Sequence, residues 1–154
     1  MATKTGTDLN ERAWRAFHKI RTQLLPPLIK HLNEEGGMSE AEYQVFIGLR
    51  TSENGQLKPS QLAEAIGWEL GRLSHQVSRM ESKGLLAKQQ CPADARSCWV
   101  GATKKGQALF DKTLPIQNKE VDRLFSDALT NEQKRSLIEI SEAIEVHLSK
   151  TLPN

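Results

Sequence analysis

The fold is most constrained by a short helix, a glycine and a second helix in immediate succession, closed by another glycine. Pro59 suits the first turn of a helix over 59–66, because proline lacks an N–H that this turn leaves unpaired anyway. Gly67 stands where two helices meet at a tight turn, and Gly84 ends a helix predicted over 70–83. The sequence therefore predicts a helix-turn-helix in the middle of the chain.

A β-hairpin is predicted directly after this motif, with strands over 85–91 and 98–102. The segment between them is rich in turn-forming residues. A turn centred on Asp94 and Ala95 would place Cys91 opposite Cys98 across the hairpin. Helices followed by a hairpin form the winged variant of the helix-turn-helix, so we expect a mainly α fold with a small β-hairpin wing.

Further helices are predicted on both sides of this motif. Two precede it, over 10–32 and 39–51. Two follow it within 104–150: a long fifth helix that begins after Thr103, and a last helix over 131–150. Ser39 with Glu42, and Thr130 with Gln133, are capping boxes in which each side chain bonds the other residue's amide. Prolines at 26–27 and 115 predict interruptions of the first and fifth helices. We expect one domain over 1–154, with a lobe over 39–102 that holds the helix-turn-helix and the hairpin, and flanking helices over 10–33 and 104–150.

The outer helices carry apolar stripes at helical spacing. The first stripe consists of Trp14, Phe17, Ile20 and Leu24, and the last of Leu137, Ile140, Ile144 and Leu148. A chain of this size has little to cover both stripes with, which indicates a homodimer. The alternative is that both stripes pack only on the chain's own core.

The helix over 70–83 has two distinct faces. Its apolar side chains, spaced to share one face, are Leu70, Leu73, Val77 and Met80. Long hydrogen-bonding side chains are predicted on the opposite face: Arg72, His75, Gln76, Arg79 and Lys83. Arginine and glutamine can each bond two atoms of a purine edge in the DNA major groove, which a helix is narrow enough to enter. The alternative is an ordinary solvated face.

Charge is unevenly distributed along the chain. Residues 72–105 hold seven bases and two acids, whereas the rest holds 14 bases and 17 acids. A basic middle between acidic ends favours one surface that meets a polyanion, although a solvated charge run has the same composition.

Spaced motifs in this region resemble the multiple-antibiotic-resistance regulator (MarR) family. The segment GWELGRLSHQVSRMESKGL at 67–85 is similar to the family's recognition helix, and the wing shows its D-x-R pattern followed by T-x-x-G, at Asp94, Arg96, Thr103 and Gly106. Two positions depart from the family, Gly71 where serine is usual and Ala102 where leucine is usual. The resemblance covers nearly the whole chain and implies a dimeric transcription regulator that binds duplex DNA. It implies that the lobe over 39–102 binds DNA and that the helices over 10–33 and 104–150 form the dimer.

The resemblance also implies which residues contact DNA. Its reading positions correspond to Arg72, Ser74, His75, Gln76 and Arg79, and its wing arginine to Arg96. With these we group further candidate DNA-binding residues from the basic stripe, the wing and the preceding helix: Lys83, Asp94, Ser60 and Gln61. We expect the helix in the major groove and the wing in the minor groove of a near-palindromic operator.

A small aromatic or amphipathic effector that relieves repression is implied by the same resemblance. The weak candidates for its site are His18, Tyr43 and Trp68, although aromatic residues at helical spacing are more often core.

Other classes of protein find little support in the sequence. No nucleophile–base pair, metal-ligand cluster, phosphate loop or cofactor motif stands out, so we expect neither an enzyme nor a cofactor. No apolar run could span a bilayer, and two cysteines fit a reducing cytoplasm. A redox role for Cys91 and Cys98 is the weaker interpretation, because most free cysteines are small apolar residues. A winged-helix module that binds protein remains the rival, but it needs no basic stripe.

Overall fold

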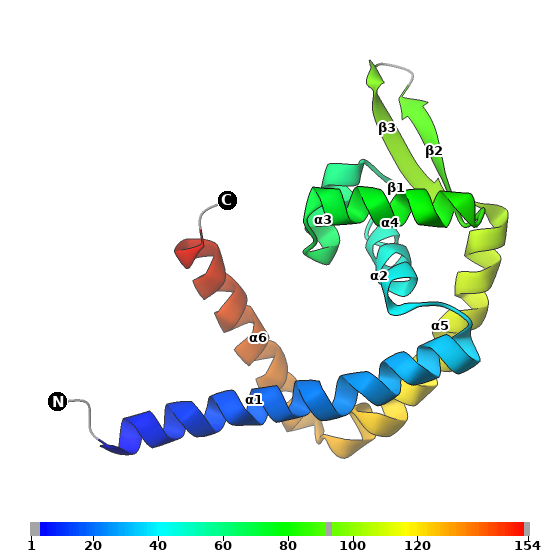
Figure 1. Ribbon diagram of the computed structural model, residues 1–154. Coiled ribbons are helices and arrows are strands. Elements are labelled where there is room, and N and C mark those ends of the chain that lie inside the picture. Colours follow the sequence, from blue (N-terminus) through cyan, green and yellow to red (C-terminus); the bar gives the residue numbers. More distant parts are fainter. Residues whose placement is uncertain (1–3, 92–93, 153–154) are drawn as a thin grey trace. The chain divides into compact units, whose positions relative to one another are not determined.

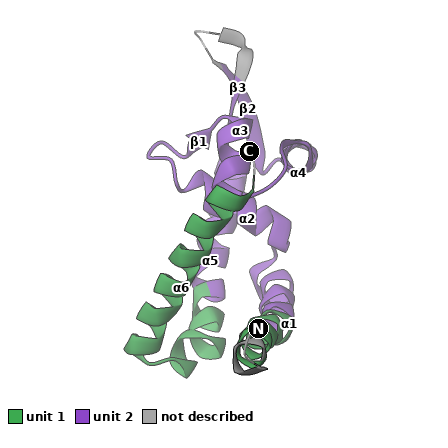
Figure 2. Cartoon of the chain, turned by 90° about the vertical axis from the view of Figure 1, so that its left-hand side faces the viewer, with its two compact units in different colours: residues 1–24, 118–154 green, residues 25–117 purple. Residues whose placement is uncertain are grey.

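The computed structural model describes residues 4–91 and 94–152, and the side chains of residues 8–90 and 98–152. The chain forms two compact units, one made of residues 25–117 and the other of the two terminal segments, 1–24 and 118–154 (Figure 2). The elements, in chain order, are α1 (Lys4–His31), a π-helical turn (Leu32–Gly36), α2 (Glu40–Leu49), β1 (Gln56–Leu57), α3 (Pro59–Ile66), α4 (Leu70–Ser82), β2 (Leu86–Cys91), β3 (Asp94–Ala102), α5 (Lys104–Leu124), a 3-10 turn (Ser126–Ala128) and α6 (Asn131–Thr151) (Figure 1). The mainly α fold with a small β wing is therefore confirmed.

The helix-turn-helix is formed by α3 and α4, as predicted. Gly67 adopts a left-handed conformation with φ of 66°, and its N–H donates to the carbonyl of Glu64. Gly84, after the end of α4, is also left-handed with φ of 71°. Glycine reaches this region without the steric cost of a side chain, so both turns follow directly from local sequence.

The wing is part of a three-stranded antiparallel sheet in the order β1-β3-β2. The predicted pairing of Cys91 with Cys98 is wrong: Cys98 lies opposite Gln90, and Cys91 opposite Asp94. The strand β3 begins earlier than predicted, and the register shifts between Gln90 and Cys91. A slip of one residue changes the face on which every side chain lies. The two-residue strand β1 was not predicted, because it is too short to show alternation.

The predicted interruptions of two helices at proline are also wrong. α1 continues through Pro26 and Pro27, and α5 continues through Pro115. All three prolines are exposed, so the carbonyl that loses its donor is close to water rather than in the core. The predicted capping boxes before α2 and α6 are both confirmed.

The core of the 25–117 unit lies between α2, α4 and α5. Phe46 and Phe110 stack at 5.1 Å between ring centroids. Leu73, Val77 and Met80 from α4 are at most 1% exposed. Burial of each such side chain contributes about 1.5–3 kcal/mol, which holds α4 firmly by one face. Leu70, predicted on that face, is 49% exposed because it lies at the first position of the helix, beyond the core.

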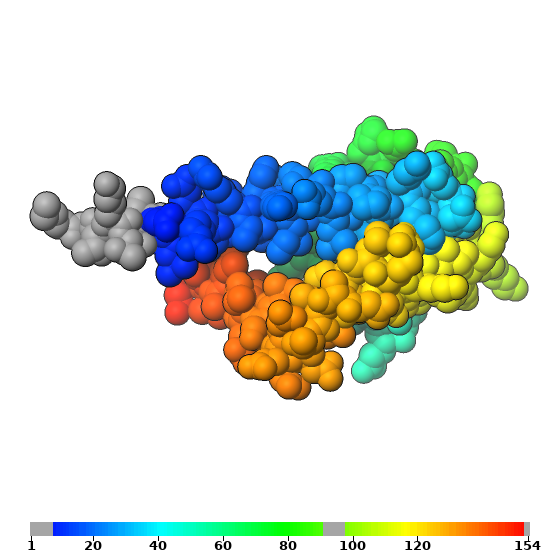
Figure 3. Space-filling view, turned by 90° about the horizontal axis from the view of Figure 1, so that it is seen from below, coloured from blue at the N-terminus to red at the C-terminus, as the bar shows by residue number. Residues whose placement is uncertain are grey.

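The terminal unit lacks a comparable core. Among residues 8–24 and 118–152 no side chain is buried. Large apolar side chains are instead exposed on α1 and on α6. Figure 3 shows the atoms of the N-terminal part of α1 in blue, at the surface of that view. Of the two predicted stripes, the exposed members are Trp14, Phe17, Ile20, Leu137, Ile140, Ile144 and Leu148. The alternative that these stripes pack only on the chain's own core therefore finds no support.

Candidate nucleic-acid interface

The outward face of α4 carries four of the ten predicted DNA-binding residues. Because Leu73, Val77 and Met80 anchor the helix, the side chains on its other face point into solvent. The exposed residues predicted to contact DNA are Arg72, Ser74, His75 and Arg79. Figure 1 shows α4 as a straight helix at the edge of its lobe, with the wing rising beside it. The structure thus brings four of the predicted residues onto one accessible helix.

Arg72 is held by an aromatic ring at the start of α4. Its guanidinium carbon lies 3.9 Å from the centroid of the Trp68 ring, and Trp68 is partly buried against the core. Such a contact is worth about 0.5–1 kcal/mol at an exposed site, and arginine keeps its hydrogen-bond donors free while stacked. Trp68 therefore serves as a platform that orients Arg72. This packing explains Trp68 without a bound ligand.

Gln76 does not belong to the exposed face. It is only 9% exposed and lies among the buried residues of α4. The prediction that Gln76 shares a solvent face with Arg72 and Arg79 is therefore wrong. Gln76 comes three residues after Leu73 and one before Val77, so it lies at the edge of the anchored face, and the packing around α4 covers it.

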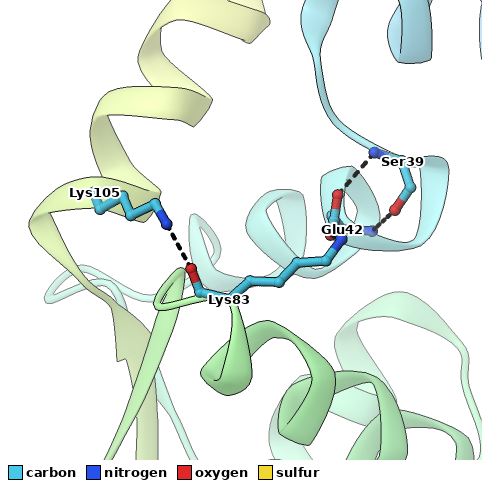
Figure 4. Close-up of polar contacts among 4 residues, drawn as sticks. All are labelled: Ser39, Glu42, Lys83 and Lys105. Atoms are coloured by element: carbon cyan, nitrogen blue, oxygen red, sulfur yellow. Dashed lines mark hydrogen bonds and ion pairs between the residues drawn. The ribbon is translucent and has the colours of Figure 1, made fainter.

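Lys83, at the C-terminal cap of α4, is engaged by a buried carboxylate. Its Nζ lies 2.6 Å from Oε1 of Glu42, whose side chain is 6% exposed (Figure 4). Burial raises the pKa of Glu42, but hydrogen bonds from Lys83 and Ser39 outweigh it and hold the pKa below its ordinary value. The sequence identified Glu42 only as a helix cap, because nothing local relates it to a lysine 41 residues away.

The start of α3 presents the two remaining predicted contacts of the helix-turn-helix. Ser60 and Gln61 are both exposed. The Oε1 of Gln61 accepts a hydrogen bond from the backbone N–H of Lys58 at 3.0 Å, which satisfies one amide at the beginning of the helix. The ammonium of Lys58 lies 5.7 Å from the ring centroid of Trp99 on β3. Lys58 is a cation near the wing that the sequence analysis did not select.

The wing is joined to α4 by an ion pair between Lys88 of β2 and Glu81, at 3.0 Å. This pair offsets the negative charge of Glu81, which lies between the basic residues Arg79 and Lys83 in the sequence. The side chains of Asp94 and Arg96 lie outside the described side chains, although their backbone belongs to β3. Their roles at the wing remain predictions.

The T-x-x-G motif of the wing has a clear physical basis. The hydroxyl of Thr103 donates to the carbonyl of Gly84 at 2.6 Å and accepts from the N–H of Gly106 at 3.0 Å. A Cβ on Gly106 would come within 2.0 Å of the carbonyl oxygen of Leu85. Glycine is required there because α5 begins directly against the backbone that leaves α4.

The weak effector-site candidates belong to different units of the chain: His18 to the terminal unit, and Tyr43 and Trp68 to the 25–117 unit. Tyr43 packs on Phe110 at 5.8 Å between ring centroids, and burial raises the pKa of its phenol above the ordinary value. His18 lies on α1 beside a shallow hollow that Trp14 and Lys19 also line. A site involving His18, Tyr43 and Trp68 stays a prediction.

Within the described residues, no three histidine, cysteine or acidic side chains are grouped so as to hold a metal ion. No helix in the described part of the chain is long and apolar enough to cross a bilayer.

A helix-turn-helix whose second helix is anchored by one face, followed by an antiparallel wing, defines a winged-helix DNA-binding protein. The model of the MarR family matches residues 38–98. The crystal structure of AbsC, a MarR family transcriptional regulator from Streptomyces coelicolor, is similar with 30% identity and a TM-score of 0.86, over 93% of this chain and 96% of that one. The chain belongs to the MarR family of transcription regulators, and its relatives are regulators rather than enzymes.

Two further relatives are informative. Sco3205, a MarR family regulator from Streptomyces coelicolor solved in complex with DNA, is 29% identical with a TM-score of 0.85, over 94% of this chain and 92% of that one. The transcriptional repressor MprA of Escherichia coli K12 is 26% identical over 122 residues, which are 79% of this chain and 68% of the relative.

Proposed function

We propose that this protein is a homodimeric transcriptional repressor in the cytoplasm, in which each protomer places α4 in the major groove of a near-palindromic duplex and its wing in the minor groove. The observation that carries the proposal is the exposed face of α4, where Arg72, His75 and Arg79 point outward from a helix whose other face is in the core. These are the side chains that read base edges and grip phosphates. Repression is favoured by the relationship to MprA, a named repressor.

The DNA-binding test uses duplexes selected by the full-length protein from a random pool. Arg79→Ala should weaken binding to the selected duplex by about 1–3 kcal/mol and binding to random duplex by less. Lys112→Ala is the matched control, because it removes one positive charge from an exposed position of α5. Equal, small effects of the two variants on the selected duplex would contradict a reading role for α4.

Dimerisation through the terminal unit is supported by its exposed apolar side chains. Trp14 is 68%, Ile140 55% and Ile144 50% exposed in the single chain, with no buried side chain among described residues 8–24 and 118–152. Large exposed apolar patches mark interfaces between proteins. A symmetric dimer would also present two copies of α4, about one helical turn or 10 base pairs apart.

The dimer is tested by sedimentation at micromolar concentration. Ile144→Glu should shift the protein toward monomer and weaken binding to a two-half-site duplex. Glu142→Gln, which also changes one charge on α6, should leave both properties unchanged. A parent protein that sediments as a monomer and still binds one half-site tightly would contradict the proposal.

Relief of repression by a small aromatic or amphipathic effector is the part of the proposal that rests on family membership. Such a ligand would weaken DNA binding by favouring a conformation with another spacing of the two α4 helices. A screen of aromatic acids against the protein–DNA complex tests it. A screen that leaves the affinity for DNA unchanged would count against this part alone.

A further inference from the structure

The C-terminal end of α4 is bonded to two other helices of the 25–117 unit. Figure 4 shows Lys83 between Glu42, in the first turn of α2, and Lys105, in the first turn of α5. The Lys83 side chain bonds Glu42, and its backbone carbonyl accepts a hydrogen bond from Nζ of Lys105 at 2.7 Å. A single residue thus joins the recognition helix to two neighbours.

Glu42 is the buried member of this group. Its Oε2 accepts from the N–H of Ser39 at 2.9 Å, while its Oε1 accepts from Lys83 at 2.6 Å. A buried carboxylate is costly unless it is paired and hydrogen-bonded, so both partners are needed. The Lys83 side chain is 56% exposed and would be well hydrated without Glu42. Because the buried Glu42 carboxylate needs a partner, the ion pair holds the Lys83 side chain in place.

The backbone that leaves α4 is constrained at the same place. The last carbonyls of a helix lack partners within it. The carbonyl of Lys83 is bonded by Lys105, and that of Gly84 by the hydroxyl of Thr103 at 2.6 Å. With Gly106 packed against Leu85, the start of α5 and the end of α4 cannot shift independently.

We propose that Glu42 is a positioning residue for DNA binding: through Lys83 it sets the orientation of α4 relative to α2 and α5, and it never touches DNA. This inference rests on the proposed role of α4 as the reading helix. It also reassigns Lys83, predicted from the sequence as a DNA contact, to an ion pair within the protein. Small rotations of α4 displace Arg72 and Arg79 from base edges, because these side chains lie far from the axis about which the helix turns.

The test compares Glu42→Gln, Lys83→Met, Lys83→Arg and the double variant Glu42→Gln/Lys83→Met in the full-length protein. Glutamine is an accepted residue at this position of a capping box, so Glu42→Gln retains the helix cap. Affinity for selected and random duplexes is measured over a salt series, at a temperature where thermal melts show every variant folded.

We expect Glu42→Gln and Lys83→Met each to weaken binding to the selected duplex about tenfold, as loss of one charge-assisted hydrogen bond would. The double variant should be no weaker than either single variant, and Lys83→Arg should recover most of the affinity. The dependence on salt should stay unchanged, because no phosphate contact is lost.

Two results would overturn the inference. In the first, Lys83→Met weakens binding to both duplexes and lowers the salt slope by about one, whereas Glu42→Gln changes neither property. That result would make Lys83 a phosphate contact. In the second, neither variant changes affinity. Arg79→Ala separates these results from failure of the proposed function: if it weakens selected binding while Glu42→Gln does not, only the inference about Glu42 fails.

Discussion

Gln76 is a nearly buried amide on the helix that is proposed to read DNA. From spacing alone Gln76 would read adenine, and Gln76→Ala would reduce specificity. In the structure Gln76 is 9% exposed and lies between the buried residues Leu73 and Val77. We therefore expect Gln76→Ala to lower the stability of the protein while leaving its choice of DNA sequence intact.

The magnitude follows from what the substitution removes. Alanine keeps the Cβ and loses one buried methylene, worth about 0.8 kcal/mol, together with the amide and the contacts it fills. A cost of about 1–2 kcal/mol in the free energy of unfolding is expected, because the site is at the boundary of the core and can partly close. For a chain of this size, this corresponds to a fall in Tm of about 2–8 °C.

The assay combines thermal melts with binding isotherms on the selected and random duplexes. His75→Ala is the matched control, because His75 is the exposed neighbour of Gln76 on the same helix. The control should leave Tm within about 2 °C, as surface substitutions usually do. If Gln76→Ala leaves Tm unchanged and reduces the ratio of selected to random affinity several-fold, the assignment of Gln76 to the buried face is refuted.

Three further outcomes are expected. Burial raises the pKa of Glu42, but its hydrogen bonds outweigh this and lower it, so the stability that Glu42 contributes is present at neutral pH. This stability is lost as the pH falls below about 4.3, the ordinary glutamate value. Melts from pH 7 to 3 should show a weaker acid dependence for Glu42→Gln, and an identical profile would contradict the pairing. Arg96→Ala should weaken selected and random duplexes alike and flatten the salt slope by about one, and a loss confined to the selected duplex would argue against a minor-groove or phosphate role. Replacing Cys91 and Cys98 with serine should leave DNA affinity within about threefold, because apolar packing is the ordinary role of free cysteine; a peroxide-dependent loss of binding in the parent alone would show otherwise.

Elements whose signals are local could be predicted from the sequence. Gly67 and Gly84 end helices because they adopt left-handed conformations, and Ser39 with Glu42 caps α2 through neighbouring amides. The bounds of α3 were predicted to the residue. Each of these features depends on backbone conformations and bonds within a few residues, so spacing is enough to find it.

The tertiary structure alone decided which side chains on those elements are available. Helical spacing could not tell that Gln76 lies at the edge of the buried face, because the width of that face depends on what packs against it. The wing register depended on where β3 begins and on an irregularity after Gln90. The pairing of Lys83 with Glu42 joins residues 41 positions apart. Such contacts arise only when separate helices pack, so no local pattern in the chain encodes them.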